Sequence, residues 1–301
     1  MLIFDCVVIG GGVAGMTAAM YLKRANIDVV IIDKGAPGGQ LNNILKIENY
    51  PGFLSISGVE LAEKIYQQIK NLNITYKYGT VLEIKNENDY KIIKTDLETI
   101  ASKTVVIASG RMPKSLGLEN EKGLIGKGIS FCSLCDGPFY KNKKVGIVGR
   151  ETQTLIEAIY LSKICQEVII INSHDRFVVN PSIEEELKTK KNIKIKTKSK
   201  VIKINESNDK LKSIVIKTNN QTEILEVDGL FINVGYLPDL EYLTNLGLNL
   251  DKNYIIVDEN MRTNIKNIYA CGDVIKKQVY QITTAVNDGT IVANSIKRDI
   301  K

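Results

Sequence analysis

The chain has 301 residues, of which 44% are hydrophobic and 25% are charged, and its formal net charge is +6. This length allows two domains of about 150 residues each, and the composition is that of an ordinary globular protein. No apolar run approaches the roughly 18 residues of a membrane span, and the N-terminus lacks the basic region and cleavage site of a signal peptide, so we expect a cytoplasmic protein with no membrane partner. No compact Lys/Arg cluster with interleaved aromatics occurs, which argues against nucleic acid as a partner.

The first 33 residues have the pattern of a strand, a glycine-rich turn, a helix and a second strand. A β-branched run covers residues 3–9, a helix is expected over Met16 to Ala25, and the second strand ends at Asp33. The turn at residues 10–15 has the spacing G-x-G-x-x-G, which permits close backbone approach to a pyrophosphate at the helix N-terminus. The acid lies 23 positions after the first glycine, where it would accept hydrogen bonds from a ribose. The pattern predicts a dinucleotide-binding unit rather than a merely tight turn.

The next segments have the composition of loops and turns, G-G-Q-L at residues 38–41 and E-N-Y-P-G-F at residues 48–53. Apolar residues at helical spacing predict a helix over Gly58 to Leu72. Alternating strands follow, and residues 104–110 indicate a buried strand that runs into a glycine turn.

A pair of cysteines lies near the middle of the chain, in the stretch Phe131–Pro138. Cys132 and Cys135 are separated by two residues, so they can close a small disulfide ring and open it again, and Asp136 follows directly as an acid/base group. A zinc site would need four ligands, but the chain has a single histidine, His174. The other three cysteines are isolated in the sequence: Cys6, Cys165 and Cys271. This is no secreted disulfide framework, and a structural disulfide is disfavoured in a reducing compartment, so redox catalysis is the favoured role and no metal is expected.

Taken together, these motifs resemble the low-molecular-weight thioredoxin reductase family of flavoproteins over nearly the whole chain. The shared segments are the first glycine turn, G-G-Q-L, E-N-Y-P-G, the A-S-G-x-x-P segment at residues 108–113, C-x-x-C-D-G, G-Y-L-P at 235–238 and I-Y-A-C-G-D-V at 268–274. The resemblance implies FAD as the cofactor, held by positions that match the family's flavin site: Gly10, Gly12, Val13, Ala14, Gly15, Asp33, Lys34, Gly39, Gln40, Leu41, Asn49, Ala108, Ser109, Gly110, Gly272, Asp273, Gln281 and Ile282.

The resemblance also implies the fold, an α/β architecture of two doubly wound, Rossmann-like nucleotide-binding domains with the second inserted in the first. We expect a discontinuous FAD-binding domain at residues 1–111 and 240–301. Residues 112–239 would form the inserted domain of NAD(P)H type, which carries the dithiol. A homodimer and a relative rotation of the two domains are further expectations.

The inserted domain keeps the scaffold of a nucleotide site but departs from its chemistry. Strands are expected at residues 145–148 and 168–171, with a helix from about Gln153 to Lys163 between them. Where the family has a second G-x-G-x-x-A, this chain has Gly-Arg-Glu-Thr-Gln-Thr at residues 149–154, so Glu151 replaces the glycine that touches the pyrophosphate. A carboxylate about 4 Å from a phosphate would cost about 4 kcal/mol at an effective dielectric constant of about 20. Thr154 also replaces the small residue that close helix–strand packing favours.

The second departure lies after the second strand of this domain. NADPH-dependent members of the family have a basic H-R-R segment and a further arginine that bind the 2′-phosphate. The matching residues here are Asn172, Ser173, His174 and Val178. Arg176 lies nearby but off the pattern, and Arg150 in the glycine turn is opposed by Glu151, while His174 is assigned no catalytic role. The sequence therefore argues against productive NADPH binding.

The preferred interpretation is a flavoprotein disulfide reductase of the ferredoxin-dependent thioredoxin reductase branch, which lacks these two nucleotide motifs. Electrons would pass from reduced ferredoxin, one at a time, through FAD and the Cys132–Cys135 pair to the disulfide of thioredoxin, with Asp136 as the general acid/base. One alternative is a thioredoxin reductase that uses NADH or NADPH through an altered site. Another is a redox-sensing or interaction flavoprotein that reduces no thioredoxin. Which of the two cysteines attacks the substrate stays open at this point.

Overall fold

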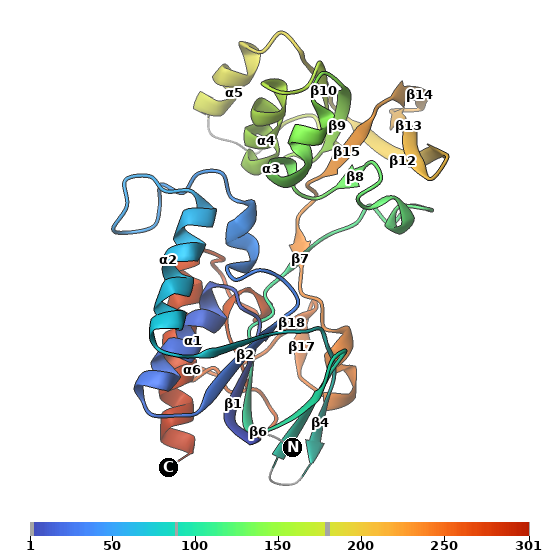
Figure 1. The fold of residues 1–301 in the computed structure, drawn as a ribbon. Coiled ribbons are helices and arrows are strands. Elements are labelled where there is room, and N and C mark those ends of the chain that lie inside the picture. The colour runs from blue at the N-terminus through green and yellow to red at the C-terminus, as the bar shows by residue number, and fades with distance from the viewer. Residues whose placement is uncertain (1–2, 88–89, 178–180, 301) are drawn as a thin grey trace. The chain divides into compact units, whose positions relative to one another are not determined.

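The chain forms two compact units, and Figure 1 labels the helices and strands of each. The computed structural model describes residues 3–87, 90–177 and 181–300. The first unit comprises Met1–Met112 and Leu237–Lys301, and the second unit comprises Pro113–Tyr236. Where the chain crosses between them, two short strands pair with each other: β7 (Met112–Pro113) and β16 (Tyr236–Leu237).

A seven-stranded sheet forms the centre of the first unit, in the order β3-β2-β1-β6-β5-β4, with β19 also paired to β6. Its strands are β1 (Ile3–Ile9), β2 (Val29–Asp33), β3 (Thr75–Tyr78), β4 (Val81–Glu87), β5 (Tyr90–Thr95), β6 (Thr99–Ile107) and β19 (Ile268–Ala270). The pairs among β3, β2, β1, β6 and β19 are parallel, and β4 and β5 extend the sheet antiparallel. Residues 6–9 of β1 are buried because a parallel sheet is covered on both faces, whereas Ile3 at the start of the strand is exposed.

The sheet of the first unit is accompanied by three long helices and several short elements. These are α1 (Val13–Arg24), α2 (Gly58–Asn71), α6 (Ile282–Asp299), the 3-10 helices η1 (Gly39–Asn43), η4 (Glu241–Leu246) and η5 (Gly272–Val274), and the hairpin of β17 (Leu250–Asp251) and β18 (Tyr254–Ile255). Helix α2 starts with a capping box, in which Ser57 and Glu60 exchange hydrogen bonds. Helix α6 packs closely on α1, since a Cβ at Gly289 would lie 2.5 Å from the carbonyl oxygen of Ala14.

The second unit contains a five-stranded parallel sheet in the order β11-β10-β9-β15-β8 and a three-stranded antiparallel sheet in the order β12-β13-β14. The strands are β8 (Ile129–Ser130), β9 (Lys144–Val148), β10 (Glu167–Ile171), β11 (Ile193–Lys196), β12 (Ser199–Ser207), β13 (Lys210–Thr218), β14 (Gln221–Glu226) and β15 (Gly229–Ile232). The helices are α3 (Ser133–Asp136), α4 (Thr152–Ser162), α5 (Pro181–Lys188) and the 3-10 helices η2 (Lys122–Leu124) and η3 (Gly137–Tyr140). Two Rossmann-like α/β folds are therefore present, and the predicted fold class is confirmed.

Among the helices of the described residues, none combines the length and apolar character that crossing a membrane requires.

Candidate active site

The first glycine turn leaves open space in front of the N-terminus of α1. Gly10 has φ +112°, and a Cβ there would lie 2.3 Å from the carbonyl oxygen of Ala108. A Cβ at Gly15 would lie 1.9 Å from the carbonyl oxygen of Gly10, so the helix packs directly on the turn. At Gly12, the N-cap of α1, an added Cβ would meet nothing within 4 Å. The first turn of α1 also carries no acidic residue, so its N–H groups are suited to a pyrophosphate.

Asp33 stands at the carboxyl end of β2, next to this turn. Its Oδ1 accepts the N–H of Gly35 at 2.7 Å, and its Oδ2 accepts the N–H of Gly11. A carboxylate has about four acceptor positions, so Asp33 can still accept hydrogen bonds from a ribose. Asp33 and Lys34 line a pocket at the carboxyl ends of β1 and β2, the place where open α/β sheets bind their ligands.

The G-G-Q-L segment lies against the first turn. The N–H of Gly38 donates to the carbonyl oxygen of Gly11 at 2.8 Å, and Gly38 forms a β-bridge with Gly12. Gly39 adopts φ +55°, which favours glycine, and Leu41, the last residue of the segment, is buried.

The segment at residues 108–111 joins these parts. Ala108 continues the pairing of β6 with β1 through a hydrogen bond from its N–H to the carbonyl oxygen of Ile9. The Ser109 hydroxyl accepts a hydrogen bond of 3.1 Å from the Tyr242 phenol, whose pKa is raised by burial. Gly110 turns the chain at φ +66°, and the carbonyl oxygen of Arg111 accepts the side-chain amide of Gln40 at 3.0 Å.

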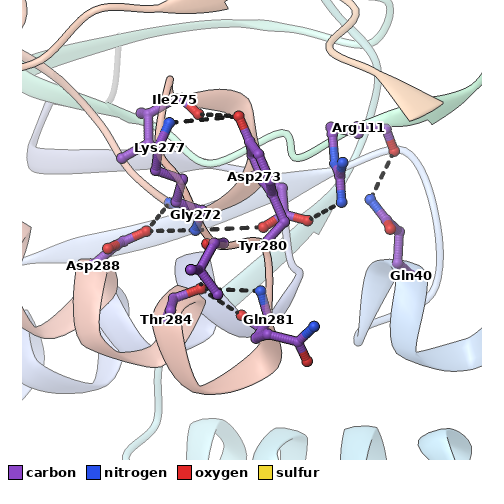
Figure 2. A network of polar contacts seen from close by, with 11 residues as sticks. Gln40, Arg111, Gly272, Asp273, Ile275, Lys277, Tyr280, Gln281, Thr284 and Asp288 are labelled. Carbon is purple, nitrogen blue, oxygen red and sulfur yellow. Dashed lines mark hydrogen bonds and ion pairs between the residues drawn. The ribbon is translucent and has the colours of Figure 1, made fainter. Parts of the chain in front are cut away.

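A charged network surrounds Asp273, as Figure 2 shows. The Arg111 guanidinium donates to Asp273 Oδ2 at 2.8 Å, and Lys277 Nζ lies 3.4 Å from Asp273 Oδ1. The same ammonium donates at 2.8 Å to Asp288, whose side chain is almost fully buried. The Tyr280 ring lies 4.4 Å from the guanidinium carbon of Arg111. Two cations thus balance two carboxylates in a partly buried setting.

Sequence reasoning found Gly272 and Asp273 but missed the other members of this network. The N–H of Gly272 donates to Asp288 at 3.3 Å, so the residue that permits the turn is tied to α6. The missed residues are Arg111, Lys277, Tyr280 and Asp288. The available signals were a cation four residues after Asp273 and an arginine directly after the A-S-G segment.

Two further predicted positions, Asn49 and Gln281, lie 232 residues apart and meet through one hydrogen bond. The Asn49 amide donates to the Gln281 side-chain oxygen at 3.0 Å. Gln281 is the N-cap of α6, its N–H donates to Thr284, and Ile282 is the first residue of the helix. The residues that the resemblance assigned to FAD therefore all belong to the first unit.

The dithiol residues belong to the second unit, where Cys132 and Cys135 form a disulfide with a Cα–Cα distance of 5.4 Å. Cys132 is the N-cap of α3 and is half-buried, whereas Cys135 is exposed. The N–H of Cys132 donates to the Ser130 hydroxyl at 3.0 Å, and the N–H of Asp136 donates to the Cys132 carbonyl oxygen at 3.1 Å. The Asp136 side chain is partly exposed beside the pair.

The second glycine turn, between β9 and α4, has the backbone course of the first turn but not its open space. Glu151 is the N-cap of α4 with φ −93° and ψ 168°, close to the φ −74° and ψ −177° of Gly12. Its exposed carboxylate therefore stands at the N-terminus of the helix, where a phosphate would have to approach. Thr154 is fully buried, and a Cβ at Gly149 would lie 2.2 Å from its hydroxyl oxygen.

Three residues of the loop after β10, Asn172, Ser173 and His174, make side-chain hydrogen bonds within the protein. The Arg150 guanidinium can only donate, so His174 Nε2 accepts its hydrogen bond at 3.0 Å. His174 Nδ1 therefore carries the proton and donates to the Ser173 hydroxyl at 2.9 Å. Asn172 is buried; its side chain accepts the N–H of His174 and donates to the carbonyl oxygen of Arg176. Val178, which was also named for this region, lies outside the described residues.

Comparisons with known proteins agree with this geometry. The family model of the pyridine nucleotide-disulphide oxidoreductases matches residues 4–289. A thioredoxin reductase of Bacillus subtilis is 34% identical over 302 residues, covering 99% of this chain and 95% of its own length. The crystal structure of Lactococcus lactis thioredoxin reductase superimposes with a TM-score of 0.91 at 35% identity, with 99% of each chain covered.

A structure of a ferredoxin-flavin thioredoxin reductase from Clostridium acetobutylicum is also similar. It is 28% identical, has a TM-score of 0.56, and the match covers 100% of this chain and 98% of that one.

Proposed function

The chain belongs to the pyridine nucleotide-disulphide oxidoreductase family, among its low-molecular-weight thioredoxin reductases, and from this we propose that it passes electrons from reduced ferredoxin, through FAD and the Cys132–Cys135 pair, to the disulfide of thioredoxin. The single observation that carries the choice of donor is Glu151, a carboxylate at the position where the first turn has Gly12.

The cofactor is FAD, and the residues of the first unit fit it. The open position at Gly12 and the N–H groups of α1 would hold the pyrophosphate, and Asp33 would accept the ribose hydroxyls. Asp273 would meet the ribityl or pyrophosphate part, and the neighbouring cations Arg111 and Lys277 reduce the repulsion that its charge would cause. When bound, FAD supplies the chemistry that links a one-electron donor to a two-electron disulfide couple.

The redox pair of the second unit performs the exchange with the substrate. Two electrons and two protons convert the Cys132–Cys135 disulfide to a dithiol. The thiolate of one cysteine then attacks the thioredoxin disulfide, forms a mixed disulfide and releases one thioredoxin thiol. The other cysteine displaces the second thioredoxin sulfur, which closes the Cys132–Cys135 disulfide again. We propose Cys135 as the attacking residue because it is the exposed member of the pair.

We propose Asp136 as the group that moves the proton during this exchange. It directly follows Cys135, and its backbone is fixed by the hydrogen bond to the Cys132 carbonyl oxygen. Since its side chain is partly exposed, it can exchange protons with solvent between turnovers.

Three features argue against NADH or NADPH as the donor. Glu151 places a negative charge at the N-terminus of α4, which would cost a bound phosphate about 4 kcal/mol at about 4 Å and an effective dielectric constant of about 20. Gly149 lacks the positive φ that Gly10 shows in the first turn. Arg150 donates to His174, so the cation nearest the turn is already engaged within the protein.

The distribution of charge suits an acidic protein partner. The second unit contains 20 Lys and Arg against 15 Asp and Glu, a net charge of +5, whereas the first unit contains 20 against 19, a net charge of +1. Residues 187–205 alone contain eight lysines and no acidic residue. Such a surface accelerates encounters with an acidic ferredoxin, and the acceleration falls as salt is added.

Steady-state turnover tests the proposal. Thioredoxin reduction is measured anaerobically with a ferredoxin that is continuously reduced, and separately with NADPH and with NADH as the only donor. We expect turnover with ferredoxin and less than about 1% of that rate with either nucleotide. Faster turnover with NADPH or NADH than with ferredoxin would replace our donor with the nucleotide.

Cysteine variants test the thiol chemistry in the same assay. Cys132→Ser and Cys135→Ser should each lower ferredoxin-driven turnover by more than about a thousandfold, because the exchange needs both sulfurs. Unchanged turnover in either variant would exclude this mechanism and favour a flavoprotein that reduces no thioredoxin.

We further propose that the protein acts in the cytoplasm as a homodimer, as expected for a thioredoxin reductase. Light scattering coupled to size exclusion should give twice the chain mass of 33.5 kDa, and a monomer at micromolar concentration would exclude the dimer.

A further inference from the structure

A buried carboxylate, Glu157, lies on α4 and has no part in the mechanism above. Its residue is 8% exposed, and it belongs to the stripe of α4 that also buries Thr154, Leu155, Ala158 and Leu161. An acid is rarely placed in such a stripe unless its charge is satisfied. The partners of this carboxylate therefore indicate why it is there.

Three neutral donors from separate parts of the second unit converge on Glu157. The Ser133 hydroxyl donates to Oε2 at 2.6 Å. The Gln153 amide donates to Oε1 at 2.9 Å, and the Asn233 amide donates to the same oxygen at 3.2 Å. These donors come from α3, from the first turn of α4 and from the segment after β15, so the carboxylate joins three elements.

Burial raises the pKa of the Glu157 carboxyl, while the hydrogen bonds from Ser133, Gln153 and Asn233 oppose that shift. All three donors are uncharged, so the carboxylate is held by dipoles rather than by an ion pair. A hydrogen bond to an ionised group is stronger than one between neutral groups, which makes this a firm anchor point.

The anchored element is the dithiol loop itself. Ser133 lies between the two cysteines, directly after Cys132, and it is 1% exposed. Consecutive Cα atoms are about 3.8 Å apart, so Glu157 is within about 9 Å of the Cys132 backbone. When the disulfide is reduced, the two sulfurs must separate, and only a fixed loop keeps them close enough to reclose readily.

We infer that Glu157 is a positioning residue for the redox pair, which acts through Ser133 to hold Cys132 where it closes on Cys135. The inference rests on the proposed redox role of the two cysteines. The reaction concerned is the uptake of two electrons and two protons by the disulfide to give two thiols. A fixed loop favours the disulfide in this couple, because the two thiols face each other at high effective concentration.

The same unit offers a matched control, Glu121. It is another buried acid, 2% exposed, and it accepts the N–H groups of Leu116 and Leu118 at 2.8 and 3.1 Å. These partners precede the dithiol segment in the chain, so Glu121 stabilises its own loop without holding Ser133.

The test is the thiol–disulfide equilibrium of the FAD-loaded enzyme in anaerobic buffers of reduced and oxidised dithiothreitol. The state of Cys132 and Cys135 is read by alkylation and mass spectrometry, and the variants are Ser133→Ala, Glu157→Gln and Glu121→Gln. Glutamine is uncharged and has one side-chain acceptor oxygen, so in Glu157→Gln no donor keeps a charged acceptor and one of the two acceptor oxygens is lost. Ser133→Ala removes the donor with little change of volume.

Both Ser133→Ala and Glu157→Gln should shift the thiol–disulfide equilibrium about threefold to tenfold toward the dithiol. The control Glu121→Gln should lower the melting temperature but leave this equilibrium within about 1.5-fold of the parent. A shift in fewer than both test variants, or an equal shift in Glu121→Gln, would overturn the inference. That outcome is distinct from failure of the proposed function, because the latter appears as unchanged turnover in the cysteine variants.

Discussion

The two glycine turns of this protein have the same backbone course and different chemistry. Gly12 and Glu151 are both N-caps in extended conformation at the start of a helix that follows a parallel strand. At Gly12 an added Cβ would meet nothing within 4 Å, whereas Glu151 carries a carboxylate into the corresponding space. Folding requires only the strand, the turn and the helix, but phosphate binding also requires empty space and no negative charge.

The two turns also differ in packing at the last position of the motif, which is Gly15 in the first turn and Thr154 in the second. A Cβ at Gly15 would overlap the carbonyl oxygen of Gly10, so only glycine fits there. The corresponding Thr154 is accommodated in the second turn, and its hydroxyl makes no hydrogen bond to any described residue. The second βαβ unit has therefore kept its fold while its turn changed.

Placing a carboxylate in the first turn, at the position that Glu151 has in the second, should have the largest effect, which is on FAD affinity. We expect Gly12→Glu to weaken FAD binding roughly a thousandfold, because about 4 kcal/mol of repulsion at the pyrophosphate corresponds to that factor. Flavin content after purification and fluorescence titration of the apoprotein measure the change in FAD affinity. Gly12→Ala is the control, since its methyl group adds no charge. Equal loss of FAD in both variants would show that the filled space, rather than the negative charge, weakens FAD binding.

The reverse exchange should restore part of a nucleotide site. Glu151→Gly combined with Thr154→Ala removes the charge and frees the packing position, so flavin reduction by NADPH should rise by at least about tenfold over the parent. Anaerobic stopped-flow absorbance measures the rate. The charge-matched control combines Glu184→Gly on α5 with Thr189→Ala just after it, and it should leave the rate of flavin reduction by NADPH unchanged. No gain in the test variant would mean that the loop after β10, and not the turn, limits binding.

The first turn also differs from the second by the charged network beside it. Lys277 is 13% exposed and pairs with Asp273 and Asp288, so Lys277→Gln leaves buried charge uncompensated and should lower the free energy of unfolding by about 2–3 kcal/mol. The neighbouring Lys276 is exposed and pairs with Asp251, so Lys276→Gln should change the free energy of unfolding by less than about 0.5 kcal/mol. Urea unfolding of the apoproteins measures both values, and equal values would contradict a buried network.

The smallest expected effect compares two buried threonines, one in each unit. The Thr154 hydroxyl makes no hydrogen bond to any described residue, so Thr154→Val should stabilise the second unit by about 1 kcal/mol. The Thr104 hydroxyl donates to the Asp5 carbonyl oxygen at 2.8 Å, so Thr104→Val should destabilise the first unit by about 1 kcal/mol. Thermal unfolding measures both changes, and two changes of the same sign would contradict the roles given to the two hydroxyls.

The βαβ units followed from local patterns in the sequence, whereas the arrangement of two domains followed from the family resemblance. Strand, glycine turn and helix recur at β1 to α1 and at β9 to α4, and the prediction of two doubly wound α/β domains is confirmed. Helix starts were less accurate, since α1 begins at Val13 and not at Met16. Gly12 serves as the N-cap, and its carbonyl oxygen accepts the N–H of Met16, so the glycine turn already contains a hydrogen bond of the helix.

The polar networks could not be predicted because their members are far apart in the chain. Arg111 and Asp273 are 162 positions apart, and Asn233 and Glu157 are 76 apart. Periodicity reports which face of a helix is buried, but it does not report which distant side chain meets that face. An acid within the apolar stripe of α4 was the only local sign of the Glu157 site.

The most direct test of the central claim is single-turnover reduction of the oxidised flavin. The enzyme is mixed anaerobically with one equivalent of NADPH or NADH, or with two equivalents of pre-reduced ferredoxin freed of chemical reductant, and the loss of flavin absorbance is followed. We predict rapid bleaching by ferredoxin and none by either nucleotide within the same time. Rapid bleaching by NADPH or NADH, with none by ferredoxin, would contradict the account that Glu151 has closed the second turn to nucleotides.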